Sequence, residues 1–120
     1  MPLSEIINTL RPQTGAQYVG GSSGQPLLTS GQTYDSGFIS NPGSARIVGT
    51  VAATTIGGTL TIDQSNDGTN ADATTTSVTV VAGTPISFSV EAVGTYFRLH
   101  YVNGAGTQGT FRLYSNLRHV

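Results

Sequence analysis

The sequence predicts an all-β protein, an antiparallel β-sandwich or jelly roll of about seven or eight strands preceded by an N-terminal arm. From residue 25 onward, apolar and polar side chains alternate with the period of two that is typical of a strand with one buried face. Turn-forming residues separate these runs at roughly ten-residue intervals. No long run with helical periodicity interrupts them, which argues against a parallel sheet with crossover helices.

Residues 1–24 differ in character from the rest of the chain and are predicted to form the arm. A short helix that Pro12 ends would carry Ile6, Ile7 and Leu10 along one side. The sequence GGSSG that closes this segment is typical of a flexible linker. Because so short a helix is marginal alone in water, its apolar side is expected to be covered by another surface.

The β-sandwich domain is predicted to span residues 25–120, and its clearest alternation lies in residues 58–65 (GTLTIDQS) and 86–92 (ISFSVEA). Further strands are expected at residues 26–30, 33–40, 45–53, 77–82, 95–102 and 110–117. The side chains expected to face the core are Leu60, Ile62, Val78, Val80, Ala82, Ile86, Phe88, Val90, Ala92, Phe97, Leu99, Tyr101, Phe111, Leu113 and Leu117. Turns are expected at residues 41–44, 57–58, 66–68, 82–85 and 103–109.

Charged residues make up 9% of the chain, well below the roughly 25% of an ordinary globular protein. The chain has no lysine, and its five cations are arginines, which gives a formal net charge of −1. Without a cationic stripe to neutralise phosphates, no nucleic-acid partner is expected. The neutral surface of Ser, Thr, Gly and Asn suits an extracellular or assembled structural protein better than a metabolic enzyme.

Cysteine is absent, which excludes disulfides and thiolate chemistry. No apolar run approaches the roughly 20 residues that cross a bilayer, so no membrane partner is expected. The first ten residues lack the basic and apolar regions of a signal peptide, so synthesis in a cytoplasm is expected.

The stretch DQSNDGTNAD, residues 63–72, has the spacing of carboxylates with which an EF-hand loop begins. Its closing position is Thr74 rather than a carboxylate, and its flanks are predicted strands, so an EF-hand is not expected. A looser calcium site using Asp63, Asp67 and Asp72 stays open as an alternative. The favoured interpretation is a hairpin turn, because glycine accepts positive φ and aspartate bonds to its own backbone. No metal is expected.

No catalytic residue and no cofactor are expected, so an enzyme is not predicted. His100 lies on the polar face of a predicted strand, His119 is next to the last residue, and no G-x-S-x-G elbow occurs. Most of the six acidic residues lie in turn-like sequence rather than as a pair facing one cleft, and no phosphate-binding glycine loop is present.

Three late tyrosines, Tyr96, Tyr101 and Tyr114, offer one further candidate, a stacking platform for sugars. The favoured interpretation places them in the core or in a subunit contact.

Residues 26–117 resemble a β-sandwich module of structural proteins from tailed bacteriophages and related prophage genes. The resemblance lies in an ordered set of strand and turn elements. These elements are Gln64-Ser65, Asp67-Gly68-Thr69-Asn70, Ala82-Gly83, Tyr96-Phe97-Arg98, Asn103-Gly104 with Gln108, and Phe111-Arg112-Leu113. The module often has a larger residue where this chain has Ala71, which weakens a stacking role for that loop. The resemblance implies a virion structural protein without catalytic residues.

The leading hypothesis is a phage capsid decoration or cementing protein, made in the host cytoplasm and located on the capsid surface of the virion. A jelly-roll body would form a homo-oligomer, with a trimer favoured, and the arm would bind the major capsid protein. The arm residues expected to make this contact are Ile6, Ile7, Leu10, Arg11 and Tyr18.

Two alternatives stay open. A tail or baseplate receptor-binding module would touch cell-surface carbohydrate through loop-tip residues such as Asn103 and Gln108. A secreted bacterial adhesion module is weaker, because it would require an export signal.

Overall fold

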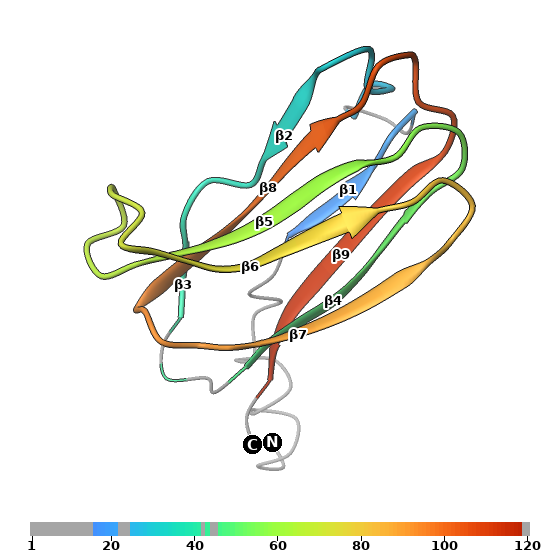
Figure 1. Cartoon of the computed structure of the whole chain (residues 1–120). Coiled ribbons are helices and arrows are strands. Elements are labelled where there is room, and N and C mark those ends of the chain that lie inside the picture. Colours follow the sequence, from blue (N-terminus) through green and yellow to red (C-terminus); the bar gives the residue numbers. More distant parts are fainter. Residues whose placement is uncertain (1–15, 22–24, 42, 44–45, 119–120) are drawn as a thin grey trace, which may run out of the picture.

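The structure, a computed structural model, describes residues 16–21, 25–41, 43 and 46–118. All regular elements in these residues are β-strands, and they form two antiparallel sheets that pack against each other (Figure 1). The predicted fold class, an all-β antiparallel β-sandwich, is therefore confirmed. No helix within the described ranges is long and apolar enough to cross a membrane.

The strands are somewhat more numerous than predicted, because several are only two or three residues long. They are β1 (Gln17–Val19), β2 (Thr33–Asp35), β3 (Ile39–Ser40), β4 (Arg46–Ala53), β5 (Gly58–Ser65), β6 (Ala73–Val80), β7 (Ile86–Glu91), β8 (Tyr96–Asn103) and β9 (Phe111–Arg118).

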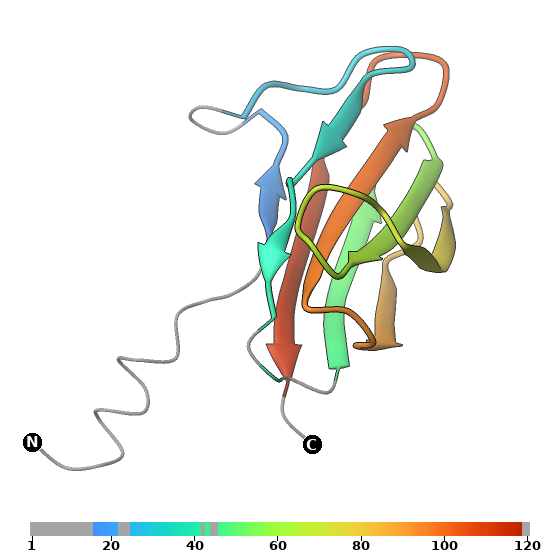
Figure 2. The ribbon, with the colours of Figure 1, turned by 90° about the vertical axis from the view of Figure 1, so that its left-hand side faces the viewer.

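The strands pair as one long hairpin that is folded across both sheets. β5 pairs with β6, β4 with β7, β2 and β3 with β8, and β1 with β9, and every pair is antiparallel. The sheet orders are β1-β9-β4-β7 and β2-β8-β5-β6, with β3 also on β8. Nested pairs shared between two sheets in this way form a jelly roll. The loop at residues 66–72 is the turn at the centre of this long hairpin (Figure 2).

The core lies between the two sheets and contains most of the side chains that the alternation predicted. The predicted side chains that are fully enclosed are Leu60, Ile62, Phe97, Leu99, Tyr101, Phe111 and Leu113, and β4 adds Ile47 and Val51, which were not among the predicted core residues. Burial of a side chain of this size stabilises the fold by about 1.5–3 kcal/mol. Ala82 is an exception, since it is exposed just beyond the end of β6.

Two features near the N-terminal end of the sandwich differ from the prediction. Residues 26–30 form no strand, because side chains and loops of the chain satisfy their backbone instead. The Leu28 carbonyl accepts a bond from the Gln108 N–H, and Leu28 itself is buried. Conversely, β1 lies inside the stretch assigned to the arm and pairs with β9 at the edge of a sheet.

Gly49 on β4 shows how tightly the core is filled. It faces inward opposite Phe88, and an added Cβ would lie 2.5 Å from that ring and 2.1 Å from the Tyr114 carbonyl oxygen. Phe88 occupies the space that a side chain at this position would need.

Candidate functional site

The two residues predicted as loop-tip contacts, Asn103 and Gln108, lie inside the protein with 2% and 1% of their surface exposed. Gln108 Oε1 accepts bonds from the backbone N–H groups of Thr55 and Ile56, at 3.2 and 3.1 Å. Its Nε2 donates to the Ile56 carbonyl at 2.6 Å and to Asn103 Oδ1 at 3.0 Å. The amide therefore takes the place of a partner strand for the β4–β5 loop.

Asn103 extends the same network. Its Nδ2 donates to the Thr29 carbonyl at 2.9 Å and to the Gly106 carbonyl at 3.1 Å. Since buried amides in such networks are occupied by backbone groups, they have little capacity left for a ligand. The prediction that Asn103 and Gln108 contact sugar is therefore corrected: the two side chains join three loops at one end of the sandwich.

Gln64 makes an equivalent connection at the other end of β5. Its Oε1 accepts bonds from the N–H groups of Val93 and Gly94, at 2.7 and 2.8 Å, and its Nε2 donates to the Glu91 carbonyl at 2.8 Å. Only 1% of Gln64 is exposed. Three of the side chains that carried the family resemblance thus hold loops in place.

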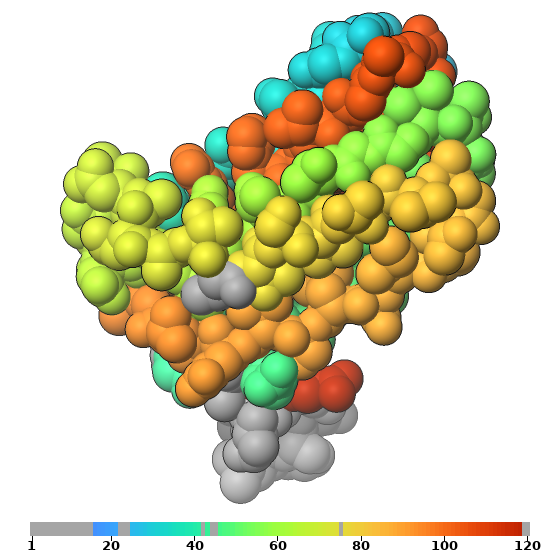
Figure 3. Space-filling model, in the orientation of Figure 1, coloured from blue at the N-terminus to red at the C-terminus, as the bar shows by residue number. Residues whose placement is uncertain are grey.

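The loop at residues 66–72 projects from one end of the molecule (Figure 3). Asp67 Oδ1 accepts bonds from the N–H groups of Thr69 and Asn70, at 2.8 and 2.9 Å. The bonds from Asn70 and Thr69 hold the pKa of Asp67 well below its usual value. Gly68 has a φ of +78°, as the predicted turn requires, but the connection is longer than a two-residue hairpin.

The carboxylates of the alternative calcium site bind different partners. Asp63 Oδ2 accepts a bond from Arg98 Nε at 2.9 Å, and Asp63 Oδ1 accepts one from Thr74 Oγ1 at 2.7 Å. Asp72 accepts a bond from the Asn66 N–H at 2.8 Å. Within the ranges that the structure describes, no group of three or more acidic or histidine side chains is arranged to hold a metal ion.

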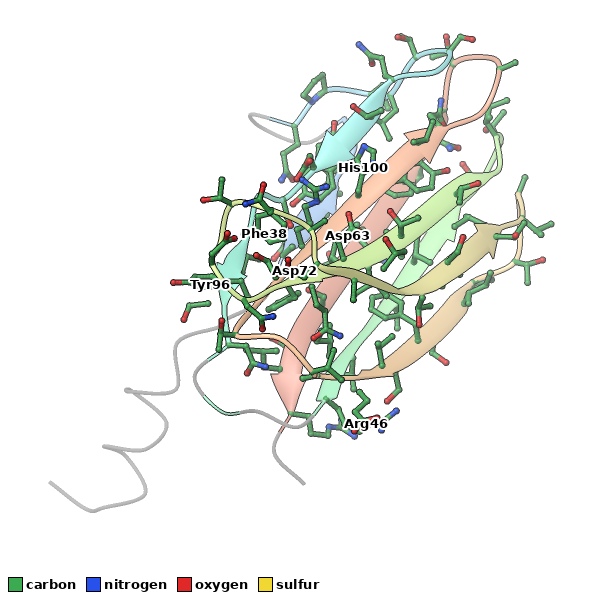
Figure 4. All side chains as sticks on the ribbon, turned by 60° about the vertical axis from the view of Figure 1, so that its left-hand side comes forward. Phe38, Arg46, Asp63, Asp72, Tyr96 and His100 are labelled. Atoms are coloured by element: carbon green, nitrogen blue, oxygen red, sulfur yellow. The ribbon has the colours of Figure 1, made fainter. Side chains whose placement is uncertain are left out.

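Arg98 is the centre of a polar cluster on the outer face of β8. Besides Asp63, its guanidinium pairs with Asp35 at 3.6 Å and lies 4.8 Å from the centre of the Phe38 ring. Phe38 and Asp63 lie in this region together with His100 (Figure 4). The cluster ties β2 and the β2–β3 connection to β8 and β5, and the charge of Arg98 is matched within it by two carboxylates.

His100 lies next to Asp35 and Thr61 in the strand register. The Thr61 hydroxyl donates to the His100 backbone carbonyl, at 3.3 Å, rather than to the imidazole. The nucleophile–base contact that acyl transfer requires is therefore not formed at this position.

The three late tyrosines do not share a surface. Tyr101 is in the core, with its ring centre 4.3 Å from that of Phe111. Tyr96 lies on the outer face of β8 beneath Gly68, whereas Tyr114 lies on the outer face of the other sheet. A common stacking platform is excluded, because an odd sequence separation on one strand places Tyr96 and Tyr101 on opposite faces.

Of the arm residues predicted to contact a partner, Ile6, Ile7, Leu10 and Arg11 lie outside the described residues, as does the predicted short helix. Tyr18 is described, and it is a correction. It is 7% exposed, its ring packs 4.7 Å from that of Tyr34, and its hydroxyl donates to the Pro26 carbonyl. Tyr18 belongs to the core and is not free to contact a partner.

The buried amides are the feature that the sequence reasoning missed. A signal was present, because Gln64 and Asn103 continue the inward parity of Ile62 and Tyr101 on their strands. A polar residue at an inward position next to a strand end predicts a side chain that bonds to loop backbone.

A family model described as the N-terminal domain of the uncharacterised protein YqxG matches residues 16–118 of this chain. The solved structure of the PBSX exported protein XepA matches with a TM-score of 0.74 and 25% sequence identity over 90% of this chain. The chain spans 38% of the length of that protein. No curated protein sequence matches this chain.

Two further solved structures match with lower TM-scores. A carbohydrate binding module from Cellvibrio mixtus lichenase 5A, in complex with cellotriose, has a TM-score of 0.45 and 19% identity over 88% of each chain. A family 43 arabinoxylan arabinofuranohydrolase from Bacillus subtilis, in complex with cellotetraose, has a TM-score of 0.44 and 17% identity, over 88% of this chain and 24% of that chain.

Proposed function

The chain belongs to the family of YqxG N-terminal domains, and from this premise we propose that it is a phage-associated structural protein of the virion. The similarity to the PBSX exported protein XepA supports a phage-associated β-rich module, as does the resemblance of residues 26–117 to such modules. Since this chain spans 38% of XepA, no activity of the whole protein is transferred.

The observation that carries a structural rather than an enzymatic role is the use made of the polar side chains. Gln64, Asn103 and Gln108 are hydrogen-bonded to the backbone of loops. Arg98 is paired with the carboxylates of Asp35 and Asp63. Because these groups stabilise the body of the protein, we expect contacts with partners to be made by extended surfaces and by the segment before β1. We propose that the protein is not an enzyme.

More specifically, the proposal is a capsid decoration protein that binds the major capsid protein through Ile6, Ile7, Leu10 and Arg11. Buried apolar residues of the described part pack into one cluster between the sheets, which leaves the apolar residues of the arm as the proposed contact with the capsid. The arm side chains would bury against the capsid, and Arg11 would supply an ion pair. The proposed location is the capsid surface, and the proposed assembly is a homo-oligomer, with a trimer favoured.

The experiment that tests this proposal is co-sedimentation with capsids that lack the protein. Ile6→Ser, Ile7→Ser and Leu10→Ser combined should abolish sedimentation with capsids, whereas the matched control Asn8→Ser with Thr9→Ser should not. Both variants should unfold at the wild-type temperature. Unchanged sedimentation of the triple variant would refute the role of the arm.

Truncation of the N-terminal arm is a second test of its role in capsid binding. The structure limits how many residues can be removed without disturbing the sandwich. Removal of residues 1–14 leaves Ala16 and β1 in place, whereas a longer deletion through residue 20 would also remove Tyr18 from the core. Light scattering of the same samples would measure the mass, and a monomer would contradict the proposed oligomer.

The alternative function, carbohydrate recognition by a tail or baseplate module, is not supported by the residues first assigned to it. Asn103 and Gln108 are buried. Carbohydrate recognition remains an alternative because the β1-β9-β4-β7 sheet carries three arginines, Arg46, Arg112 and Arg118, on strands β4 and β9.

A further inference from the structure

Charge is divided unequally between the two sheets. Of the described residues, Asp35, Asp63, Asp67, Asp72 and Arg98 belong to the β2-β8-β5-β6 sheet or its β5–β6 loop, whereas Arg46, Arg112, Arg118 and Glu91 belong to the β1-β9-β4-β7 sheet. The second sheet therefore carries three cations against one anion. We call its outer surface, with Arg46, Arg112, Tyr114 and Arg118, the arginine face.

The arginine face is ordered by the strand register. Alternate residues of β9 point outward, which sets Arg112, Tyr114 and Arg118 along one line about 20 Å long. Arg46 on β4 lies directly beside Arg118, and Thr50 lies beside Tyr114. The cationic groups are thus distributed along one strand and its neighbour.

The arginines of this face are held by neutral groups. Arg46 Nε donates to Ser89 Oγ at 2.7 Å, and Arg46 Nη2 donates to the Ser89 carbonyl at 3.2 Å. Arg112 Nη2 donates to the Tyr114 hydroxyl at 3.2 Å, and its guanidinium lies 5.3 Å from the centre of the Tyr114 ring. These contacts orient two guanidinium groups without reducing their charge.

No carboxylate among the described residues pairs with these three arginines, although Glu91 is the cross-strand neighbour of Arg46. On the opposite sheet, Arg98 pairs with two aspartates. The positive charge of the arginine face therefore stays available to an anion.

A shallow trough of about 460 Å³ lies over β4 and β7 on this face. Its lining includes Val48, Thr50, Ser87, Ser89 and Arg118. Gly49 and Phe88 complete the lining, so the trough has apolar as well as hydroxyl-bearing residues.

We propose that the arginine face binds an anionic oligosaccharide. Its acid group would lie between the guanidinium groups of Arg46 and Arg118, which suit a planar carboxylate or a phosphate. Sugar hydroxyls would bond to Thr50 and Ser87 in the trough, while Ser89 keeps its bond to Arg46. This inference goes beyond the proposed virion role and does not depend on the arm.

A saccharide fits the face better than a bilayer does. The large hydrophobic side chains most exposed in the described part are Leu27, Val81, Val93 and Val102, and none belongs to a strand of this sheet. A membrane-binding surface would need such side chains beside its cations. The hydroxyl groups of Thr50, Ser87 and Ser89 in the trough, together with its apolar lining, suit a saccharide, which has both hydroxyl groups and apolar ring faces.

The test is calorimetric titration of the full chain at low salt with three oligosaccharides of equal length. One carries carboxylates (oligogalacturonate), one carries phosphates, and one is neutral. Comparison of the two acidic oligosaccharides identifies which acid group the protein binds. The proposal expects binding to at least one acidic oligosaccharide and not to the neutral one. Arg46→Gln with Arg118→Gln should weaken that binding by about tenfold or more, because two charge-assisted contacts are lost.

The matched control is Thr33→Glu with Ser77→Glu, which changes the net charge equally but on exposed positions of the other sheet. It should bind the acidic oligosaccharide as the wild type does, and both variants should melt at the wild-type temperature. Equal loss in both variants would overturn the site, since only net charge would then matter.

Three further results would overturn the proposal: no binding of either acidic oligosaccharide, equal binding of the neutral one, or binding of phosphatidylglycerol vesicles alone. Capsid binding separates this inference from the proposed function. The arginine variant should still sediment with capsids, whereas the arm variant should still bind the saccharide. Loss of capsid binding in the arginine variant would assign the face to a protein partner instead.

Discussion

Replacing Gln108 by methionine tests whether its amide holds the loops together. Methionine has a similar length and volume, so the substitution removes hydrogen bonds without leaving a large cavity. In the native protein the amide makes four bonds, with the Thr55 and Ile56 N–H groups, the Ile56 carbonyl and Asn103 Oδ1.

The expected loss follows from the number of these bonds. At about 1 kcal/mol each, with a range of roughly 0.5–1.5, four bonds correspond to about 4 kcal/mol of unfolding free energy. Part of this cost arises because backbone groups that are shielded from water lose their partner. For a chain of this length the melting temperature should fall by roughly 15 °C.

The assay is urea or thermal unfolding followed by circular dichroism, and the control is Gln32→Met. Gln32 is exposed and its Oε1 accepts a single bond, from the Thr29 N–H at 2.8 Å. This control should lose no more than about 1 kcal/mol. If the two methionine variants unfold at the same urea concentration, the assignment of Gln108 as a structural connection is refuted.

Three further changes probe the core and the β5–β6 loop. Tyr101→Phe should keep the wild-type stability or gain up to about 1 kcal/mol, because the Tyr101 hydroxyl is buried and has no hydrogen-bond partner among the described residues; a loss above about 1 kcal/mol on urea unfolding would show that the hydroxyl is bonded. Gly49→Ala should cost at least about 1–3 kcal/mol, because the added Cβ would clash with the Tyr114 carbonyl oxygen and with the Phe88 ring; adding Phe88→Leu should recover only the part due to the ring, and additive losses in the double variant would contradict that contact. The depressed pKa of Asp67 means that its contribution to stability is present above the usual value of 3.8 and is lost as the pH falls below it. In an NMR titration the Asp67 carboxyl should show a pKa well below 3.8, and a pKa at the usual value would contradict this prediction.

The strands of the second half of the chain were predictable because their alternation is a local property. Residues 58–65 form β5 with the predicted bounds, and β7 differs from its prediction by one residue. The prediction was wrong for residues 26–30, where Leu28 is buried without a strand partner. It also missed β1, whose three residues are too few to show a period.

The turn conformation of the loop at residues 66–72 was predictable from the sequence, but the position of this loop in the strand topology was not. Asp67 and Gly68 have the aspartate-to-backbone bonds and the positive φ that the sequence predicts. That this loop is the turn of the whole nested hairpin depends on the pairing of β4 with β7 and of β1 with β9. Such pairings join residues far apart in the chain, and alternation cannot specify them.

By itself, the sequence determined the fold class, most of the side chains that face the core and the turn residues, since each depends on residues within a few positions of one another. Only the tertiary structure decided that Gln108 meets Thr55 and Ile56, more than fifty positions away. It likewise decided that Arg46 and Arg118 lie side by side on one face while the aspartates gather on the other. The physical reason is that hydrogen-bond partners and the distribution of surface charge depend on which strands become neighbours. The alternation of apolar and polar residues within a strand is the same whichever strand pairs with it, so the alternation cannot specify the neighbour.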